Sequence, residues 1–191
     1  HRLRLKQVYE GLSVARAQVF SAIPYLLHVN DPIFPGHYER AGQVHGVALF
    51  EFNAAFQKSI ASLFRIQAPD TQDVGFRPVI RSIFASTNIG TLLQRPGDGV
   101  TFFLVVDLRS MGEAVRAQLR LRVDAIANWA SECGLVTHFV FVDPVWSAKG
   151  DFGSLANEPA RGALVLERFY RTAVYLVGEV PIFWCTSPGA D

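Results

Sequence analysis

The segment Thr101-Phe-Phe-Leu-Val-Val-Asp107 decides the fold, because its residues are apolar in succession rather than in alternation. Such a strand is typical of a sheet that is covered on both faces. Apolar residues at helical spacing follow it, namely Val115, Leu119, Val123, Ile126 and Ala130. Gly134 ends the expected helix, and a second apolar strand runs from Val136 to Val142. This order predicts an α/β or α+β domain with one mixed sheet flanked by helices.

The start of that helix has the spacing of a capping box, with Ser110 three residues before Glu113. In a capping box the Ser side chain accepts a hydrogen bond from a first-turn amide, and the Glu reaches back to the cap residue. We therefore expect the capping residue to be Ser110 and the helix to extend to Cys133.

Shorter segments on either side complete the expected sheet. Before the central strand we expect a strand over 79–84, a turn over 86–90 and a loop over 94–99. After the second strand we expect a loop over 149–161, a helix over 164–177 closed by Gly178, and a last strand over 180–184.

The N-terminal part is predicted to be mainly helical. A stripe of apolar residues indicates one long helix over 3–28, which Pro24 would kink. The prolines of Asn30-Asp-Pro-Ile-Phe-Pro-Gly36 end it. A short strand over 44–52, a helix over 53–64 and a loop over 67–77 follow. We expect one domain over 1–191, with an N-terminal helical part (1–78) and a sheet-containing core (79–191).

Composition limits the classes of partner. The 191 residues are 50% hydrophobic, enough for a sizeable core, and 18 Lys+Arg against 17 Asp+Glu give a net charge of +1. So small an excess argues against wholesale binding of nucleic acid or of an anionic membrane surface. No apolar run approaches the roughly 20 residues that span a bilayer. We therefore expect no nucleic-acid partner and no membrane insertion.

Two cysteines, Cys133 and Cys185, are too few for a disulfide framework, and no zinc-binding spacing is present. A cytoplasmic location is the simplest expectation. Because the chain starts at His1 and stops in Ser-Pro-Gly-Ala-Asp, we expect it to be a fragment of a longer polypeptide.

Five segments, in this order along the chain, carry a resemblance to a known family: Leu26–Gly36, Asn128–Gly134, Gly153–Leu155, Leu166–Val174 and Ile182–Trp184. Together they resemble the N-terminal catalytic domain of class I (enterobacterial-type) adenylate cyclases, in the order of that family. The resemblance implies a polymerase-β-like nucleotidyltransferase fold.

The resemblance also implies a reaction centre. In that family a Gly-Ser turn lets backbone amides approach a triphosphate, and an Asp-x-Asp pair with a third carboxylate holds two magnesium ions. This chain has Ala85-Ser86 in place of Gly-Ser, and Gly99-Val100-Thr101 in place of Asp-x-Asp. The third position falls at Val136, followed by Thr137 and His138. We therefore expect metal-dependent cyclisation to be lost.

Residual nucleotide binding is a second hypothesis. The residues that the resemblance places around a nucleotide are Ser86, Thr87, Gly90, Arg81, Gly153, Ser154 and Arg171. Three further arginines that would frame a phosphate pocket are Arg77, Arg161 and Arg168. Each set has a structural alternative: Arg168 and Arg171 could pair with Glu167, and Gly153-Ser154 could form a simple turn.

Working catalysis is a third hypothesis, in which Asp98 and Asp107 supply a displaced magnesium site. Alternatively, Asp98 belongs to a Pro-Gly-Asp-Gly turn and Asp107 ends a strand.

Other chemistry-bearing residues have simple structural roles as alternatives. His138 is either a base or a hydrogen-bonded core residue, and we favour the core. His28, His37 and His45 could form a zinc or catalytic cluster, but their spacing is irregular, and we do not favour this hypothesis. Ser86 lacks a nearby base for a hydrolase triad. Tryptophans expected in the core or an interface are Trp129, Trp146 and Trp184.

The leading hypothesis is an inactive adenylate-cyclase-like domain with a regulatory or protein-interaction role. Its partner would be another domain of the same chain or a separate protein, and it would need no cofactor. The alternatives are an active cyclase that makes cyclic AMP and pyrophosphate from ATP with magnesium, and a sensor that binds ATP or a related nucleotide without turnover.

Overall fold

A four-stranded mixed sheet forms the centre of the molecule. The computed structural model describes residues 2–39, 43–51, 53–67, 77–89, 91–92, 95, 97–143 and 172–179. In these residues the helices are α1 (Arg2–Gly11), α2 (Val14–His28), α3 (Ala54–Phe64) and α4 (Glu113–Glu132). The strands are β1 (Ile80–Thr87), β2 (Val100–Val106), β3 (Thr137–Val142) and β4 (Val174–Gly178).

The strands lie in the order β3-β2-β1-β4. β1 is antiparallel to both β2 and β4, whereas β2 and β3 are parallel and joined through α4. A parallel pair needs such a crossover, and the succession of apolar residues in β2 fits its central place. The predicted mixed α+β class is confirmed.

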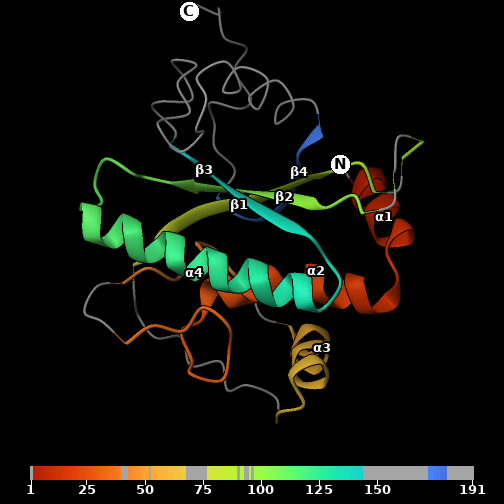
Figure 1. Ribbon diagram of the computed structural model, residues 1–191, viewed down its shortest axis with the longest axis horizontal. Helices are drawn as coiled ribbons and strands as arrows, with labels where there is room; N and C mark the ends of the chain where they lie inside the picture. The colour runs from red at the N-terminus through yellow and green to blue at the C-terminus, as the bar shows by residue number, and fades with distance from the viewer. Residues whose placement is uncertain are drawn as a thin grey trace, which may run out of the picture.

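Helices α2 and α4 pack on one face of the sheet. Figure 1 shows α2 and α4 side by side beneath the strands, with α3 on their far side. Buried residues from helices and strands form one core there; among them, the rings of Phe20 on α2 and Phe102 on β2 lie 5.6 Å apart. Trp129 on α4 stacks on Phe64 of α3, with ring centroids 5.3 Å apart. The prediction that Trp129 lies in the core or in an interface is therefore confirmed, since the side chain is partly buried against the core.

The opposite face of the sheet is also buried. A second, smaller cluster contains Phe84, Phe103, Val105 and Val142, each at most 6% exposed. The expectation that both faces of the sheet are covered is therefore confirmed for β1 and β2, whereas His138 of β3 is exposed on this face.

The prediction of one helix over 3–28 is wrong, because the chain breaks at Leu12 and Ser13. The Ser13 side chain accepts a hydrogen bond from the Arg16 amide and caps α2. Ser is a favoured cap, and Gly11 before it weakens the continuing helix. Pro24, in contrast, lies inside α2 without ending it.

A buried arginine holds the segment that follows α2. The Arg122 side chain on α4 donates to the carbonyl oxygens of Leu26, Val29 and Gly36, the last at 2.6 Å. Its guanidinium also lies 5.5 Å from the ring centroid of Tyr38. Burial lowers the pKa of Arg122 to about 10, so the group stays charged at neutral pH. The bonds to Leu26 and Val29 satisfy carbonyls at the C-terminal end of α2, where a positive charge is favourable, and the bond to Gly36 holds the segment that follows.

Three other local predictions are wrong for physical reasons. The capping residue of α4 is Gly112, because the Ser110 hydroxyl donates instead to the carbonyl oxygen of Asp107, 3.0 Å away. Residues 44–51 form irregular chain with a single bridge from Val47 to Ile80. The predicted helix over 164–177 is contradicted at β4, where pairing with β1 overrides local helical spacing. Residues 164–171 and the predicted strand over 180–184 lie outside the described residues.

Candidate functional site

The strand register brings two positions of the expected reaction centre, Ser86 and Thr101, into one row with His138, whereas Val136, the expected third position, is exposed before β3. Ser86 on β1 lies opposite Thr101 on β2, and Thr101 lies beside His138 on β3. Because side chains alternate along a strand, these three share the sheet face that carries Phe84 and Phe103. The row therefore contains two hydroxyls and an imidazole, and no carboxylate.

Ser86 and Thr87 are engaged within the protein. Both belong to β1, so the predicted turn over 86–90 starts two residues too early. The Ser86 hydroxyl is buried and lies 2.7 Å from the Thr172 hydroxyl oxygen. The Thr87 hydroxyl donates to the Gly99 carbonyl oxygen at 2.8 Å and accepts from the Ile89 amide at 3.0 Å. Both hydroxyls therefore form hydrogen bonds that stabilise the end of β1.

The place of the first expected carboxylate is sterically closed. An ideal Cβ on Gly99 would lie 2.6 Å from the Val136 carbonyl oxygen and 3.2 Å from its carbonyl carbon. That carbonyl oxygen accepts a hydrogen bond from the Val100 amide at 2.9 Å, which holds the two strands together there. An aspartate at position 99 would require the backbone to move.

Asp98 lies in a turn before β2. Its carboxylate accepts a hydrogen bond from the Arg95 amide at 2.7 Å, and its own amide donates to the Arg95 carbonyl oxygen at 3.1 Å. It lines a pocket beside Arg16 and the end of α1, together with Ile89 of the core on the helix-covered side. The turn interpretation of Asp98 is confirmed.

Asp107 lies at the other end of β2. Its carboxylate accepts from the Ser110 amide at 3.3 Å, as expected for a residue that ends a strand. A strand rises about 3.3 Å per residue, so Asp98 and Asp107 are on the order of 25–30 Å apart. They cannot share a metal site.

A carboxylate that the sequence analysis did not single out is Asp143, directly after β3. It is 2% exposed, accepts a hydrogen bond from the Leu108 amide at 3.0 Å and lies 3.8 Å from the Arg109 Nε. Its hydrogen bond with Leu108 links the chain after β3 to the chain after β2, at the same end of these parallel strands. No group of three or more His, Cys, Asp or Glu side chains in the described part of the chain could hold a metal ion.

The arginines near β1 either form ion pairs or hydrogen bonds within the protein or are exposed. Arg81 pairs with Glu179, with Nε 3.6 Å from the carboxylate, and Arg77 is exposed. Arg4 on α1 donates to the carbonyl oxygens of Thr87 and Ile89, and burial lowers its pKa. The sequence analysis missed Arg4, because it reaches the end of β1 from the far end of the chain.

The histidines do not form the clustered site. The His45 Nδ1 lies 2.5 Å from the Tyr38 hydroxyl, and the His28 Nδ1 accepts from the Val47 amide at 3.1 Å. Burial, with Arg122 and His28 nearby, lowers the pKa of His45 to about 4, so it is neutral at pH 7. His138 is exposed on β3, so the expectation of a core histidine there is wrong. Its strand neighbours Thr137 and Phe139 face the helices instead.

Several predicted residues cannot be placed. Those that lie outside the described residues are Gly90, Gly153, Ser154, Arg161, Arg168, Arg171, Trp146, Trp184 and Cys185.

Magnesium requires hard, anionic oxygen ligands, and the residues of the row do not supply them. A side chain at Gly99 would clash with the Val136 carbonyl oxygen. Thr101 has a neutral hydroxyl and His138 has imidazole nitrogens, so neither supplies an anionic oxygen ligand. The described residues of this row therefore do not fit a magnesium centre.

Comparison with known proteins matches residues 1–184 to the family described as the adenylate cyclase NT domain. The chain is 27% identical over 194 aligned residues to an adenylate cyclase of Proteus mirabilis and 28% identical over 193 to one of Yersinia pestis. It is 26% identical over 196 to that of Escherichia coli K12. Each alignment covers 98% of this chain and 22% of the relative, so the chain spans about a fifth of the length of these relatives.

No solved structure matches the chain. In the described residues, none of the helices combines the length and the apolar character needed to cross a bilayer.

Proposed function

The chain belongs to the family of adenylate cyclase N-terminal domains, and from this membership we propose that it is a non-catalytic member of the family. In this proposal the domain keeps the nucleotidyltransferase fold, has lost metal-dependent cyclisation, and acts as a regulatory or protein-interaction module. Its partner is another domain of the same chain or a separate protein.

One observation carries the proposal: the row of Ser86, Thr101 and His138 contains no carboxylate, and Gly99 has no room for one. Two cations beside a triphosphate need several anionic ligands to hold them and to offset the charge that develops during transfer. Without them the triphosphate would be neither positioned nor neutralised. Family membership together with a row that lacks carboxylates therefore supports a role in binding rather than in turnover.

The active-cyclase alternative would need Asp98 and Asp107 to act together. Their separation along β2 and their turn hydrogen bonds give that alternative no support. A nucleotide sensor remains compatible with family membership. However, the hydroxyls of Ser86 and Thr87 and the guanidinium of Arg81 already have protein partners.

Calorimetric titration of the chain with ATP, with and without magnesium, tests the proposal when combined with measurement of cyclic AMP. The Escherichia coli relative serves as the positive control for turnover. We expect no magnesium-dependent heat and no cyclic AMP from this chain. Magnesium-dependent turnover would overturn the proposal, and metal-independent ATP binding without turnover would establish the sensor instead.

If turnover appeared, Asp98→Ala would test the displaced site directly. Loss of activity in that variant would assign the metal site to Asp98, whereas unchanged activity would place the reaction centre elsewhere.

A further inference from the structure

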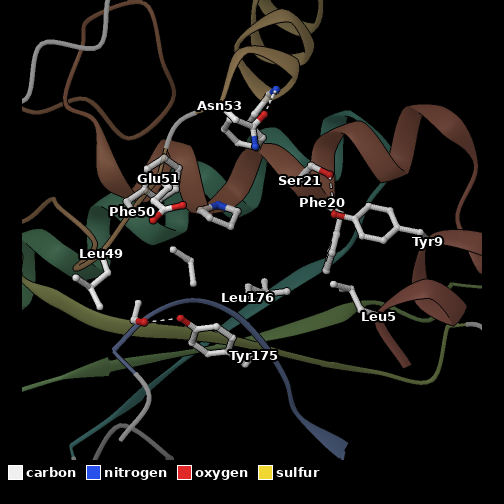
Figure 2. A pocket seen from close by; sticks show the side chains of 14 residues that line it. Leu5, Tyr9, Phe20, Ser21, Leu49, Phe50, Glu51, Asn53, Tyr175 and Leu176 are labelled. Atoms are coloured by element: carbon white, nitrogen blue, oxygen red, sulfur yellow. Dashed lines mark hydrogen bonds between the residues drawn. The ribbon is translucent and has the colours of Figure 1, made fainter. Parts of the chain in front are cut away.

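A cleft of about 590 Å³ opens at the edge of the sheet where β4 lies, and none of Ser86, Thr101 and His138 is among its lining residues. It runs between α1 and α2 on one side and residues 49–51 with the start of α3 on the other, above Tyr175–Gly178 of β4 (Figure 2). Its volume is within the range of about 300–1,000 Å³ that is typical of small-molecule sites.

Aromatic side chains form part of the lining of the cleft, as five of its fourteen described lining residues. The five aromatic residues are Tyr9, Phe20, Phe50, Phe56 and Tyr175. Figure 2 places Phe50 at one end of the cleft, Tyr9 and Leu5 at the other, and Tyr175 and Leu176 along the strand. Such walls bury apolar ligand surface, and the faces of aromatic rings attract cations.

Glu51 is the only formally charged side chain among the fourteen residues that line the cleft. It lies beside Phe50 and is exposed, and no described residue forms an ion pair or a hydrogen bond with its carboxylate. The hydroxyls and the Asn53 side-chain oxygen have protein partners: the Tyr9 and Ser21 hydroxyl oxygens lie 3.0 Å apart, the Tyr175 hydroxyl donates to the Gly178 carbonyl oxygen, and the Asn53 oxygen accepts from the Phe56 amide. The described lining of the cleft therefore carries one negative charge that no described residue neutralises.

The chain at the rim is strained. Leu49, next to Phe50, has a φ of 51° and a side chain that is 74% exposed. A non-glycine residue in the left-handed region costs free energy, and such residues are concentrated at functional sites. Here the strained residue precedes the two residues that give the cleft one aromatic wall and its charge.

We propose that this cleft binds a small organic monocation, an ammonium group carried on an aromatic or alkyl body. The ammonium would lie at the Glu51 carboxylate and the apolar body between the aromatic walls. A nucleotide is a poor ligand for the same cleft, because none of its described lining residues is a lysine, arginine or histidine that could offset phosphate charge. The proposal is thus independent of whether the family's reaction centre works.

Three probes of matched size test the charge preference: 2-phenylethylammonium, neutral 2-phenylethanol and anionic 3-phenylpropanoate. Amide chemical shifts of the isotopically labelled chain would report both affinity and location. We expect saturable shifts at lining residues such as Ser21, Leu176 and Val177. The cation should bind about fivefold more tightly than the neutral probe, the scale of an exposed ion pair.

Glu51→Gln should remove that advantage and leave the affinity for 2-phenylethanol unchanged. Glu132→Gln, on the exposed C-terminal end of α4, is the matched control and should change neither affinity. The proposal is overturned if no probe shifts the lining residues. It is equally overturned if the anion binds as tightly as the cation, or if Glu51→Gln leaves the order of affinities intact.

Discussion

The carbonyl oxygen of Val136 occupies the space that a side chain at Gly99 would need, since an ideal Cβ would lie 2.6 Å from it. The same oxygen accepts the Val100 amide, so β2 and β3 approach closely because position 99 is a glycine. This contact links the loss of an expected carboxylate to the packing of the sheet.

Gly99→Ser should lower the free energy of unfolding by about 1–3 kcal/mol, because the new side chain must displace backbone. Chemical denaturation measures the change. Gly112→Ser is the matched control, since nothing lies within 4 Å of a Cβ there and serine is a good helix cap. Equal stability of the two variants would show that the strands can separate at Gly99 without cost.

Arg122→Lys should lower the free energy of unfolding by about 2–4 kcal/mol, because a lysine cannot reach the same set of carbonyl oxygens. The carbonyls at the end of α2 would be left without their donor. Arg120→Lys, on the exposed side of α4, should change stability by less than about 0.5 kcal/mol. A loss in the Arg120 variant as large as that in Arg122→Lys would contradict the anchoring role.

Arg65→Gly should raise the free energy of unfolding by about 0.5–1 kcal/mol. Arg65 is exposed and ends α3 in the left-handed conformation with a φ of 54°, which glycine adopts without steric cost. Lys58→Gly, in the middle of the same helix, should instead destabilise by about 1 kcal/mol. A thermal melt of each variant shows whether its stability rises or falls. Destabilisation by both substitutions would contradict the left-handed cap geometry at Arg65.

The pKa of His45 is about 4 in the folded chain, below its usual value of 6.5, so the unfolded state takes up a proton first as the pH falls. The stability associated with neutral His45 is therefore present above pH 6.5 and lost as the pH falls towards 4. Between pH 7 and pH 5 we expect a loss of about 1 kcal/mol, discounted because the ring is only half-buried.

Denaturation of the chain and of His45→Asn at both pH values isolates this contribution. The asparagine oxygen can replace Nδ1 as the acceptor for the Tyr38 hydroxyl but does not titrate. The loss on acidification should be smaller in the variant. Identical losses would assign the pH dependence to other groups.

The centre of the fold was predictable because local pattern and tertiary environment agree there. β2, α4 and β3 follow from successive apolar residues, helical spacing and a terminal glycine, and Gly134 indeed has a φ of 83°. β4 was missed because its pairing partner, β1, is distant in sequence while its own spacing is helical. The prediction that Ser110 caps α4 is wrong because its hydroxyl donates to the Asp107 carbonyl oxygen instead. The Ser-x-x-Glu spacing does not take such a competing hydrogen bond into account.

The candidate site was predictable in position but not in geometry. Aligned motifs pointed to Ser86, Gly99 and Thr101, and the strand register then brings Ser86, Thr101 and His138 together. The steric closure at Gly99 depends on a backbone contact between two strands, which a sequence does not display. The exposure of His138 could have been predicted from the alternation of side chains along a strand, because Thr137 and Phe139 occupy the other face of β3.

The most direct test of the central claim is titration with Mn²⁺, which takes the same oxygen ligands as magnesium and broadens nearby amide resonances. The signals of Ser86, Thr101 and His138 should be followed in the presence and absence of ATP. An absence of site-specific, saturable broadening at these residues is the predicted result. Saturable broadening centred on this row at micromolar Mn²⁺ would contradict the account.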